Sequence, residues 1–143
     1  MASGMNEPLY TTEILRLAAS LGDPCELEHE DGRAEVRSPT CGSRIALAVE
    51  LDEERRVKRL SMWVHACAFG QASAALVERH GLGRTRAEIS DAMIEVGRWL
   101  AHERDEVNAW PGIVALEPAR RRKSRHGAIL LPFRALLAAM DAA

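Results

Sequence analysis

The chain has 143 residues, of which 47% are hydrophobic and 28% are charged, and its formal net charge is −2. These values predict a single folded domain over residues 1–143 and give no reason to expect nucleic acid as a partner. No apolar run approaches the roughly 18–20 residues that span a membrane, and residues 1–8 lack the pattern of a targeting peptide.

The first part of the chain predicts a helix and then a short hairpin. An amphipathic pattern predicts the helix from Thr12 to Ser20, and Gly22-Asp23-Pro24 should end it. The next segment, Leu27 to Val36, is expected to form the hairpin, because Asp31-Gly32 suits a type I′ turn.

A second and longer hairpin is predicted from two runs of alternating apolar residues. The runs are Arg44–Leu51 and Val57–Val64, and a charged segment separates them. Antiparallel pairing that puts the apolar residues on one face opposes Ile45 to Met62 and Leu47 to Leu60. This register places Cys41 beside Ala66 and Cys67 at the open end of the hairpin. Two thiols that are distant in sequence are therefore expected to meet.

Two helices are predicted after the hairpin. The first should cover Ala68 to His80, with Gly81 as its C-terminal cap. Thr85 and Glu88 form a capping box that begins the second helix. The apolar residues expected on its buried face are Ile89, Met93, Val96, Trp99 and Leu100.

The last part of the chain predicts a long loop over about residues 103–127 and a final helix over about residues 128–142. Pro132 is acceptable in that helix only near its first turn, where backbone N–H groups have no helical partner. The predicted fold class is α+β, with a small antiparallel sheet and helices packed on one of its faces.

Cysteines are the first candidates for chemistry. Three cysteines without a secretion signal favour free thiols in the cytoplasm. Cys41 lies in a turn, and Cys67 lies where a strand gives way to a helix, whose positive end would lower the pKa of the thiol. The alternative is that each thiol is a small buried hydrophobic group, but their expected convergence favours a site. Cys25 has no expected role.

His126 is the best candidate for a third member of this site, because it lies where the long loop meets the last helix. His65, two residues before Cys67, is a second candidate. Two cysteines and a histidine would suit zinc, iron or an iron–sulfur cluster. The histidines expected to be solvated are His29, His80 and His102.

A basic run from Arg120 to Arg125 carries five cations in six positions. One interpretation is a solvated loop that neutralises nearby acids, namely Glu103, Asp105 and Glu106. The other is a docking patch for an acidic partner or for a helix C-terminus. No motif of a phosphate-binding loop, a serine nucleophile or a zinc protease is present, and the chain is not expected to be an enzyme.

Four segments, in order along the chain, resemble the U-type iron–sulfur cluster assembly scaffolds, which comprise the NifU N-terminal and IscU-like proteins. The segments are Leu9-Tyr10, Pro39-Thr40-Cys41-Gly42-Ser43, Trp63 to Ser73 and Ser124 to Leu130. The similarity runs from about Leu9 to Ala139, with an insertion at about Val96–Gly112. The resemblance implies a three-stranded antiparallel sheet with helices packed on one face.

The resemblance also implies a metal site. Members of this family hold zinc or a nascent [2Fe–2S] cluster through three cysteines, an aspartate and a histidine. Cys41 matches the first cysteine, Cys67 the second and His126 the histidine, whereas Ser43 stands at the position of the aspartate. Gly127 stands at the position of the third cysteine. The implied set of Cys41, Cys67, His126 and Ser43 is therefore incomplete.

Three functions follow from these observations. The favoured one is a scaffold-like protein of iron–sulfur cluster assembly that binds iron, zinc or a [2Fe–2S] cluster and meets a cysteine desulfurase or an acceptor apoprotein. The second is a metal-free interaction protein on the same fold, which docks a desulfurase or another partner through its basic loop. The third and most distant is a thiol enzyme that uses Cys67 with His65 or His126.

Overall fold

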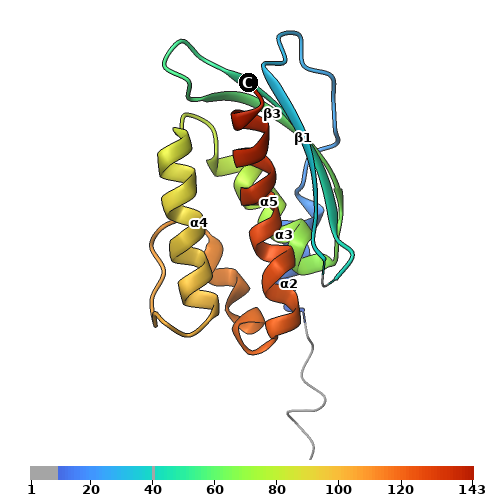
Figure 1. The fold of residues 1–143 in the computed structure, drawn as a ribbon. Helices are drawn as coiled ribbons and strands as arrows, with labels where there is room; N and C mark the ends of the chain where they lie inside the picture. The colour runs from blue at the N-terminus through green and yellow to red at the C-terminus, as the bar shows by residue number, and fades with distance from the viewer. Residues whose placement is uncertain (1–9, 40) are drawn as a thin grey trace, which may run out of the picture.

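A three-stranded antiparallel sheet with helices packed against one face forms the frame of the protein, as the sequence predicts (Figure 1). The computed structural model describes residues 10–39 and 41–143. Some residues named in the sequence analysis therefore lie outside the described residues. They are the segment compared with targeting peptides, Leu9 of the first motif and Thr40 of the second. The described elements in chain order are α2 (Thr12–Ala19), β1 (Gly32–Arg37), β2 (Arg44–Leu51), β3 (Val57–His65), α3 (Ala68–His80), α4 (Arg86–Leu100), the 3-10 helix η1 (Ile113–Arg121) and α5 (Lys123–Asp141).

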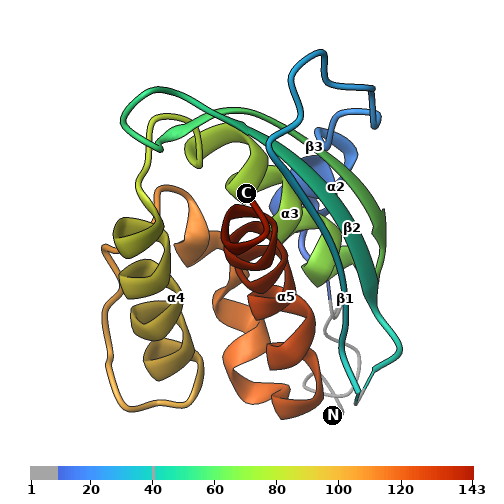
Figure 2. The same cartoon turned by 45° about the horizontal axis from the view of Figure 1, so that its top comes forward.

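The helices lie in two layers beside the inner face of the sheet (Figure 2). In the inner layer α3 packs on β3 and α5 packs on β1 and β2, while α2 packs against α3. In the outer layer α4 contacts α5 and η1, and it contacts none of the described strands. The side chains of the sheet that face the helices and are fully buried include Ile45, Leu47, Val49 and Met62. Within the described ranges, none of the helices combines the length and apolarity that crossing a membrane requires.

The hairpin of β2 and β3 has the predicted faces but not the predicted register. The opposed pairs are Ile45 with Val64 and Leu47 with Met62. The pair next to the turn is Leu51 with Val57, whereas the predicted register pairs Val57 with Glu50, which is a shift of one residue. A bulge next to Glu50 leaves one residue of β3 without a partner and adds a second residue to the shift. The resulting shift is two residues. Because side chains alternate with a period of two, this shift keeps the apolar residues on the inner face.

The hairpin predicted over Leu27 to Val36 is wrong, because most of its second arm belongs to β1, an edge strand that pairs with β2. Asp31 does not turn the chain but binds β2. Its N–H donates to the Val49 carbonyl at 2.8 Å, and its carboxylate accepts from the Leu51 N–H at 2.7 Å. Pairing with β2 gives every residue of β1 a partner in the antiparallel ladder, whereas a local hairpin of Leu27 to Val36 would not.

The last helix begins at Lys123, five residues earlier than predicted, so that Pro132 lies in its interior. A proline there removes the hydrogen bond to the Ala128 carbonyl. α3 lies close to this point, since a Cβ on Gly70 would be 3.4 Å from the Ala128 oxygen. The Ser73 hydroxyl donates to the neighbouring Ile129 carbonyl at 2.6 Å. Packing of α3 thus stabilises a helix that its own sequence would interrupt.

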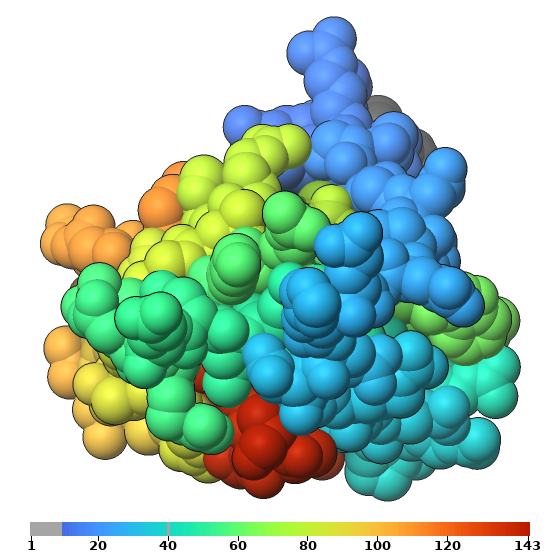
Figure 3. All heavy atoms as spheres, turned by 90° about the horizontal axis from the view of Figure 1, so that it is seen from above, coloured from blue at the N-terminus to red at the C-terminus, as the bar shows by residue number. Residues whose placement is uncertain are grey.

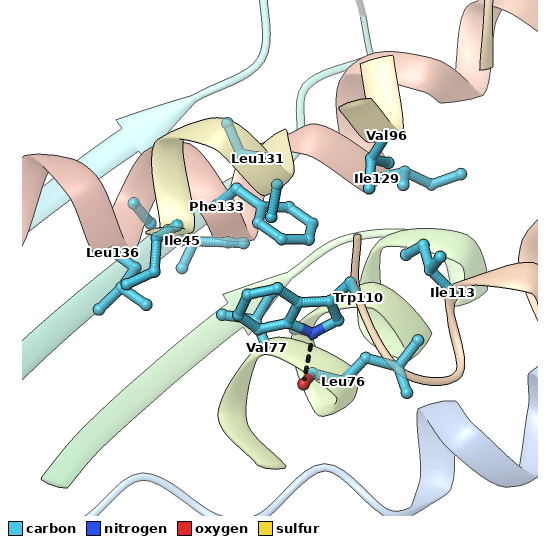
Figure 4. Packing of buried hydrophobic residues seen from close by; sticks show 14 of the residues in the cluster. Ile45, Leu76, Val77, Val96, Trp110, Ile113, Ile129, Leu131, Phe133 and Leu136 are labelled. Carbon is cyan, nitrogen blue, oxygen red and sulfur yellow. Dashed lines mark hydrogen bonds between the residues drawn. The ribbon is translucent and has the colours of Figure 1, made fainter. Parts of the chain in front are cut away.

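The long loop predicted over residues 103–127 is also partly wrong, because η1 and the start of α5 lie within it. Trp110 anchors this region in the core. Its indole N–H donates to the Leu76 carbonyl at 3.0 Å, and its ring meets Phe133 edge to face at 5.1 Å between centroids (Figure 4). The local sequence contains Pro111, Gly112 and Pro118, which disfavour an α-helix but permit a 3-10 turn.

Figure 3 shows the end of α5 between the turn that joins β2 to β3 and the segment that leads into β1. This packing requires a glycine at position 32, because a Cβ there would collide with the backbone oxygen of Ala139.

We expect Gly32→Ala to lower the free energy of unfolding by about 1–3 kcal/mol. The matched control is Gly97→Ala, whose Cβ would lie 3.8 Å from the nearest Leu130 atom and should raise stability by roughly 0.5–1 kcal/mol. Urea denaturation measures the free energy of unfolding of both variants. A Gly32→Ala variant as stable as the parent would contradict the close packing at Gly32.

Candidate functional site

The two thiols singled out by the sequence lie at the same end of the sheet. Arg44, the first residue of β2, is paired with His65, the last residue of β3. Cys41 comes three residues before Arg44, and Cys67 comes two residues after His65, where it forms the N-cap of α3. Cys41 is exposed and Cys67 is half-buried, and both are free thiols. We call this end of the molecule the thiol end.

Cys41 is held by a tight turn between β1 and β2. The turn is closed by the Ser38 N–H, which donates to the Ser43 carbonyl at 2.9 Å. The Cys41 Sγ lies 3.0 Å from the Ser43 Oγ, and Ser43 is buried. Burial raises the pKa of the Cys41 thiol, but hydrogen bonds from Ser38 and Ser43 and the charge of Arg125 outweigh it, so the pKa lies below the usual value.

Tyr10 and Arg125 connect the two thiols electrostatically. Burial, the charge of a Cys67 thiolate and a hydrogen bond with Cys67 raise the pKa of the Tyr10 hydroxyl, against the opposing charge of Arg125. The Tyr10 ring meets Phe69 of α3 edge to face at 5.0 Å. Arg125 acts on Tyr10 and also on Cys41. Sequence reasoning did not name either residue as part of the site, although both stand in segments that resemble the family.

His126 lies in the first turn of α5, not at a junction between loop and helix as predicted. Its Nε2 is 2.9 Å from the Ala119 carbonyl and 3.3 Å from the Arg120 carbonyl. A carbonyl oxygen only accepts, so Nε2 carries the hydrogen. Nδ1 is therefore the nitrogen that the neutral ring has left for a metal.

The candidate ligands do not form a three-residue metal centre in this arrangement. Among residues 10–39 and 41–143, no group of three or more His, Cys, Asp and Glu side chains is placed to hold one metal ion. Cys25 lies apart from the thiol end, on the outer face of the sheet, where its N–H donates to the Ser61 Oγ at 2.8 Å. His65 is exposed at the end of β3, and of the three histidines expected to be solvated His80 is half-buried.

The basic run divides into one structural residue and several exposed cations. Arg120 stacks over Trp99 at 5.3 Å and donates to the carbonyls of Trp99 and Arg104 at 2.8 and 2.9 Å. The remaining cations of the run make no ion pair with a described acid, and neither do the acids that they were expected to neutralise. Within the described part of the chain, the cations of the run thus form no ion pair with Glu103, Asp105 or Glu106, the acids named in the first interpretation.

Arg125 favours the thiolate form of Cys41. It lies in the first turn of α5, and its charge helps to lower the pKa of that thiol. Thiolate is the form of cysteine that binds metals and attacks sulfur, so this end is suited to soft metal ions or to sulfur chemistry.

No protein-family model matches the chain, and no curated protein matches it. Solved structures resemble it over nearly its whole length. The N-terminal part of a NifU-like protein from Brucella abortus is 28% identical, and the match covers 94% of this chain and 93% of that one with a TM-score of 0.84. A protein assigned as an iron–sulfur cluster assembly scaffold for the SUF system of Fervidobacterium islandicum is 20% identical over 92% of this chain and 96% of that one, with a TM-score of 0.81. At that identity the second match shows the fold alone.

These matches confirm the resemblance that the sequence motifs indicate. The chain resembles the U-type scaffold proteins, with a three-stranded antiparallel sheet and helices packed against it.

Ser43→Ala tests the environment of Cys41. The variant removes a hydrogen bond that lowers the pKa of the Cys41 thiol, so the pKa should rise and thiolate should form only at higher pH. Alkylation of the Cys41 peptide, followed by mass spectrometry across a pH series, should therefore shift to higher pH. Ser20→Ala, far from the thiol end, is the control. An unchanged Cys41 profile would show that Ser43 does not control the thiol.

Proposed function

We propose that this chain is a non-enzymatic, scaffold-like protein of iron–sulfur cluster assembly that works in the cytoplasm as a single domain. The observation that carries the proposal is the match to a NifU-like protein over nearly the full length of both chains. The position of Cys41 and Cys67 at one end of the sheet supports it. In this proposal the cargo is iron, zinc or a nascent [2Fe–2S] cluster, and the partners are a cysteine desulfurase and an acceptor apoprotein.

The candidate side chains have the right types of donor atom for this cargo, but they are fewer than the family pattern supplies. Cys41 and Cys67 would supply two thiolates, His126 would supply Nδ1, and Ser43 would supply at most a weak oxygen donor. Thiolate and imidazole are the donors that zinc and iron–sulfur centres prefer. Gly127 has no donor, so one position is left for a ligand from a partner or from solvent. Fewer thiolates also hold ferric iron and sulfide less strongly, which suits brief occupancy rather than storage.

Metal analysis of anaerobically purified protein tests the proposal. Protein prepared without a chelator should hold about one zinc or iron per chain, because Cys41, Cys67 and His126, once drawn together around the ion, would leave one open position of a tetrahedral site. Cys41→Ala and Cys67→Ala should each abolish the bound metal, as measured by elemental mass spectrometry and by the absorption spectrum.

Cys25→Ala is the matched control, because Cys25 is an equally free thiol outside the thiol end. It should retain the metal. A metal content near zero in the native protein, with no uptake on reconstitution, would contradict binding. An equal loss in the Cys25 variant would contradict the proposed location.

A metal-free interaction protein on the same fold is the second candidate. The absence of a three-residue metal centre among the described residues favours it. So do the exposed cations Arg121, Arg122 and Lys123, which stand at the positive end of α5 without a described acidic partner. Cations at that end of a helix are unfavourable in isolation, and an acidic surface on a desulfurase or another partner would stabilise them.

Gly127→Cys separates the two candidates. It adds the third thiolate of the family pattern within α5, next to His126, and should raise metal or cluster retention above that of the parent. Gly127→Ala is the control, because it removes the glycine without adding a donor. Adding Ser43→Asp is a less clean test, since Ser43 is only 4% exposed and a carboxylate there would be partly desolvated.

The parent and the Gly127→Cys variant together decide between the candidates. Binding by the variant alone would favour the metal-free interaction protein, because the fold would then position ligands that the natural chain lacks. Equal binding by both would favour the scaffold and show that Cys41, Cys67 and His126 suffice. Binding by neither would contradict a metal site at the thiol end.

A further inference from the structure

β1 is an edge strand whose outer side has no strand partner among the described residues. The Ser38 N–H donates to the Ser43 carbonyl, so Ser38 and Ser43 form a hydrogen-bonded pair of the antiparallel ladder. Hydrogen-bonded pairs recur at every second residue, which decides which residues of β1 bond to β2. Ala34 and Val36 therefore bond to β2, and the backbone groups of Arg33, Glu35 and Arg37 point to the free edge. Figures 1 and 2 show α5 running beside β1, on which it packs, and no strand beyond β1.

The side chains along this edge alternate in charge. Asp31, Arg33, Glu35 and Arg37 are all exposed on the side of the sheet away from the helices. Their ion pairs within the chain are local, with Arg33 bound to Glu30 at 2.7 Å and Arg37 to Glu35 at 3.4 Å. The arginine side chains of these pairs are 66% and 69% exposed, so both remain accessible to a second partner.

The spacing of these charges makes the edge complementary to itself. If two copies of β1 pair antiparallel about a two-fold axis at Ala34, Arg33 of each copy faces Glu35 of the other. Arg37 faces Asp31, whose N–H and carboxylate are already bonded to β2, so the Arg33–Glu35 contacts carry the complementarity. The same register opposes the free backbone groups of Arg33 and Glu35, which can then exchange both hydrogen bonds. Opposite charges at directly facing positions stabilise paired strands.

The neighbouring symmetric registers are unfavourable. An axis at Glu35 opposes Glu35 to itself and Arg33 to Arg37, and an axis at residue 33 opposes Arg33 to itself. An axis at Val36 keeps Glu35 opposite Arg37. It also places Arg33 opposite Pro39, which has no N–H to donate. Among these registers, the axis at Ala34 alone opposes Arg33 to Glu35 at both symmetric contacts together with their free backbone groups.

We propose that two copies of this protein associate through β1 in this register, so that their sheets join into one continuous sheet. The arrangement covers the exposed edge, which otherwise invites non-specific pairing. Because the paired strands run in opposite directions, the two thiol ends point away from each other and both stay open to partners. The proposal does not depend on whether the chain binds a metal.

Exchange of charges tests this proposal. Arg33→Glu places a carboxylate opposite Glu35 of the other copy, and Glu35→Arg places a guanidinium opposite Arg33, in both symmetric contacts at once. Each single variant should raise the dimer dissociation constant at least about tenfold. The double variant, Arg33→Glu with Glu35→Arg, restores opposite pairs and should return the constant to near the parent value. Mixing the two single variants should likewise restore association, because each then faces its opposite.

Sedimentation of the parent and the variants up to about 1 mM measures these constants, and circular dichroism verifies the fold of each variant. Hydrogen exchange at low and high protein concentration adds a residue-level test. The amides of Arg33, Glu35 and Arg37 should gain protection with concentration, while those of Ala34 and Val36 should be protected throughout. A parent that stays monomeric, single variants that associate like the parent, or a folded double variant that does not associate would each overturn the proposal.

Discussion

Burial of α5 between the sheet and α4 is the constraint on which the rest of the structure depends. α5 packs on β1, β2, α3, α4 and η1, and ten of its residues are buried. Apolar burial of this extent is the main favourable term in folding. It also sets the positions of both ends of the helix. The C-terminal end packs against Gly32 of β1, and the N-terminal end brings Arg125 to the thiol end.

This placement gives the thiol end a positive character. Arg125 acts on Cys41 and on Tyr10, and Tyr10 in turn interacts with Cys67. A site that has two thiolates in place of three, and an arginine nearby, differs in charge from one built on three thiolates and an aspartate. It stabilises the Cys41 thiolate while offering fewer anionic donors to a metal cation. The same residues can therefore serve a weakly held cargo or a metal-free contact, and both proposals above rest on this balance.

The sequence predicted the fold well and the site only in part. Alternation with a period of two identified β2 and β3, and a capping box identified the start of α4, because both signals lie within a few neighbouring residues. The same kind of reasoning misjudged Pro132, since the groups that surround it belong to α3. The hairpin pattern predicted that Cys41 and Cys67 lie at one end of the sheet, as they do, but the contacts of Tyr10 and Arg125 involve residues far apart in the chain.

The sequence by itself determined the types of the main elements, the faces of the central strands, the position of both thiols at one end of the sheet, and the absence of a thiol at Gly127. These properties follow from residue identity and short-range periodicity. Only the tertiary structure decided the register of β2 and β3, the pairing of β1 with β2, the helical conformation around Pro132 and the nitrogen of His126 that binds the backbone. Each of these depends on a hydrogen bond or a packing contact that the local pattern does not specify, and a period of two leaves several registers equally compatible with the same buried face.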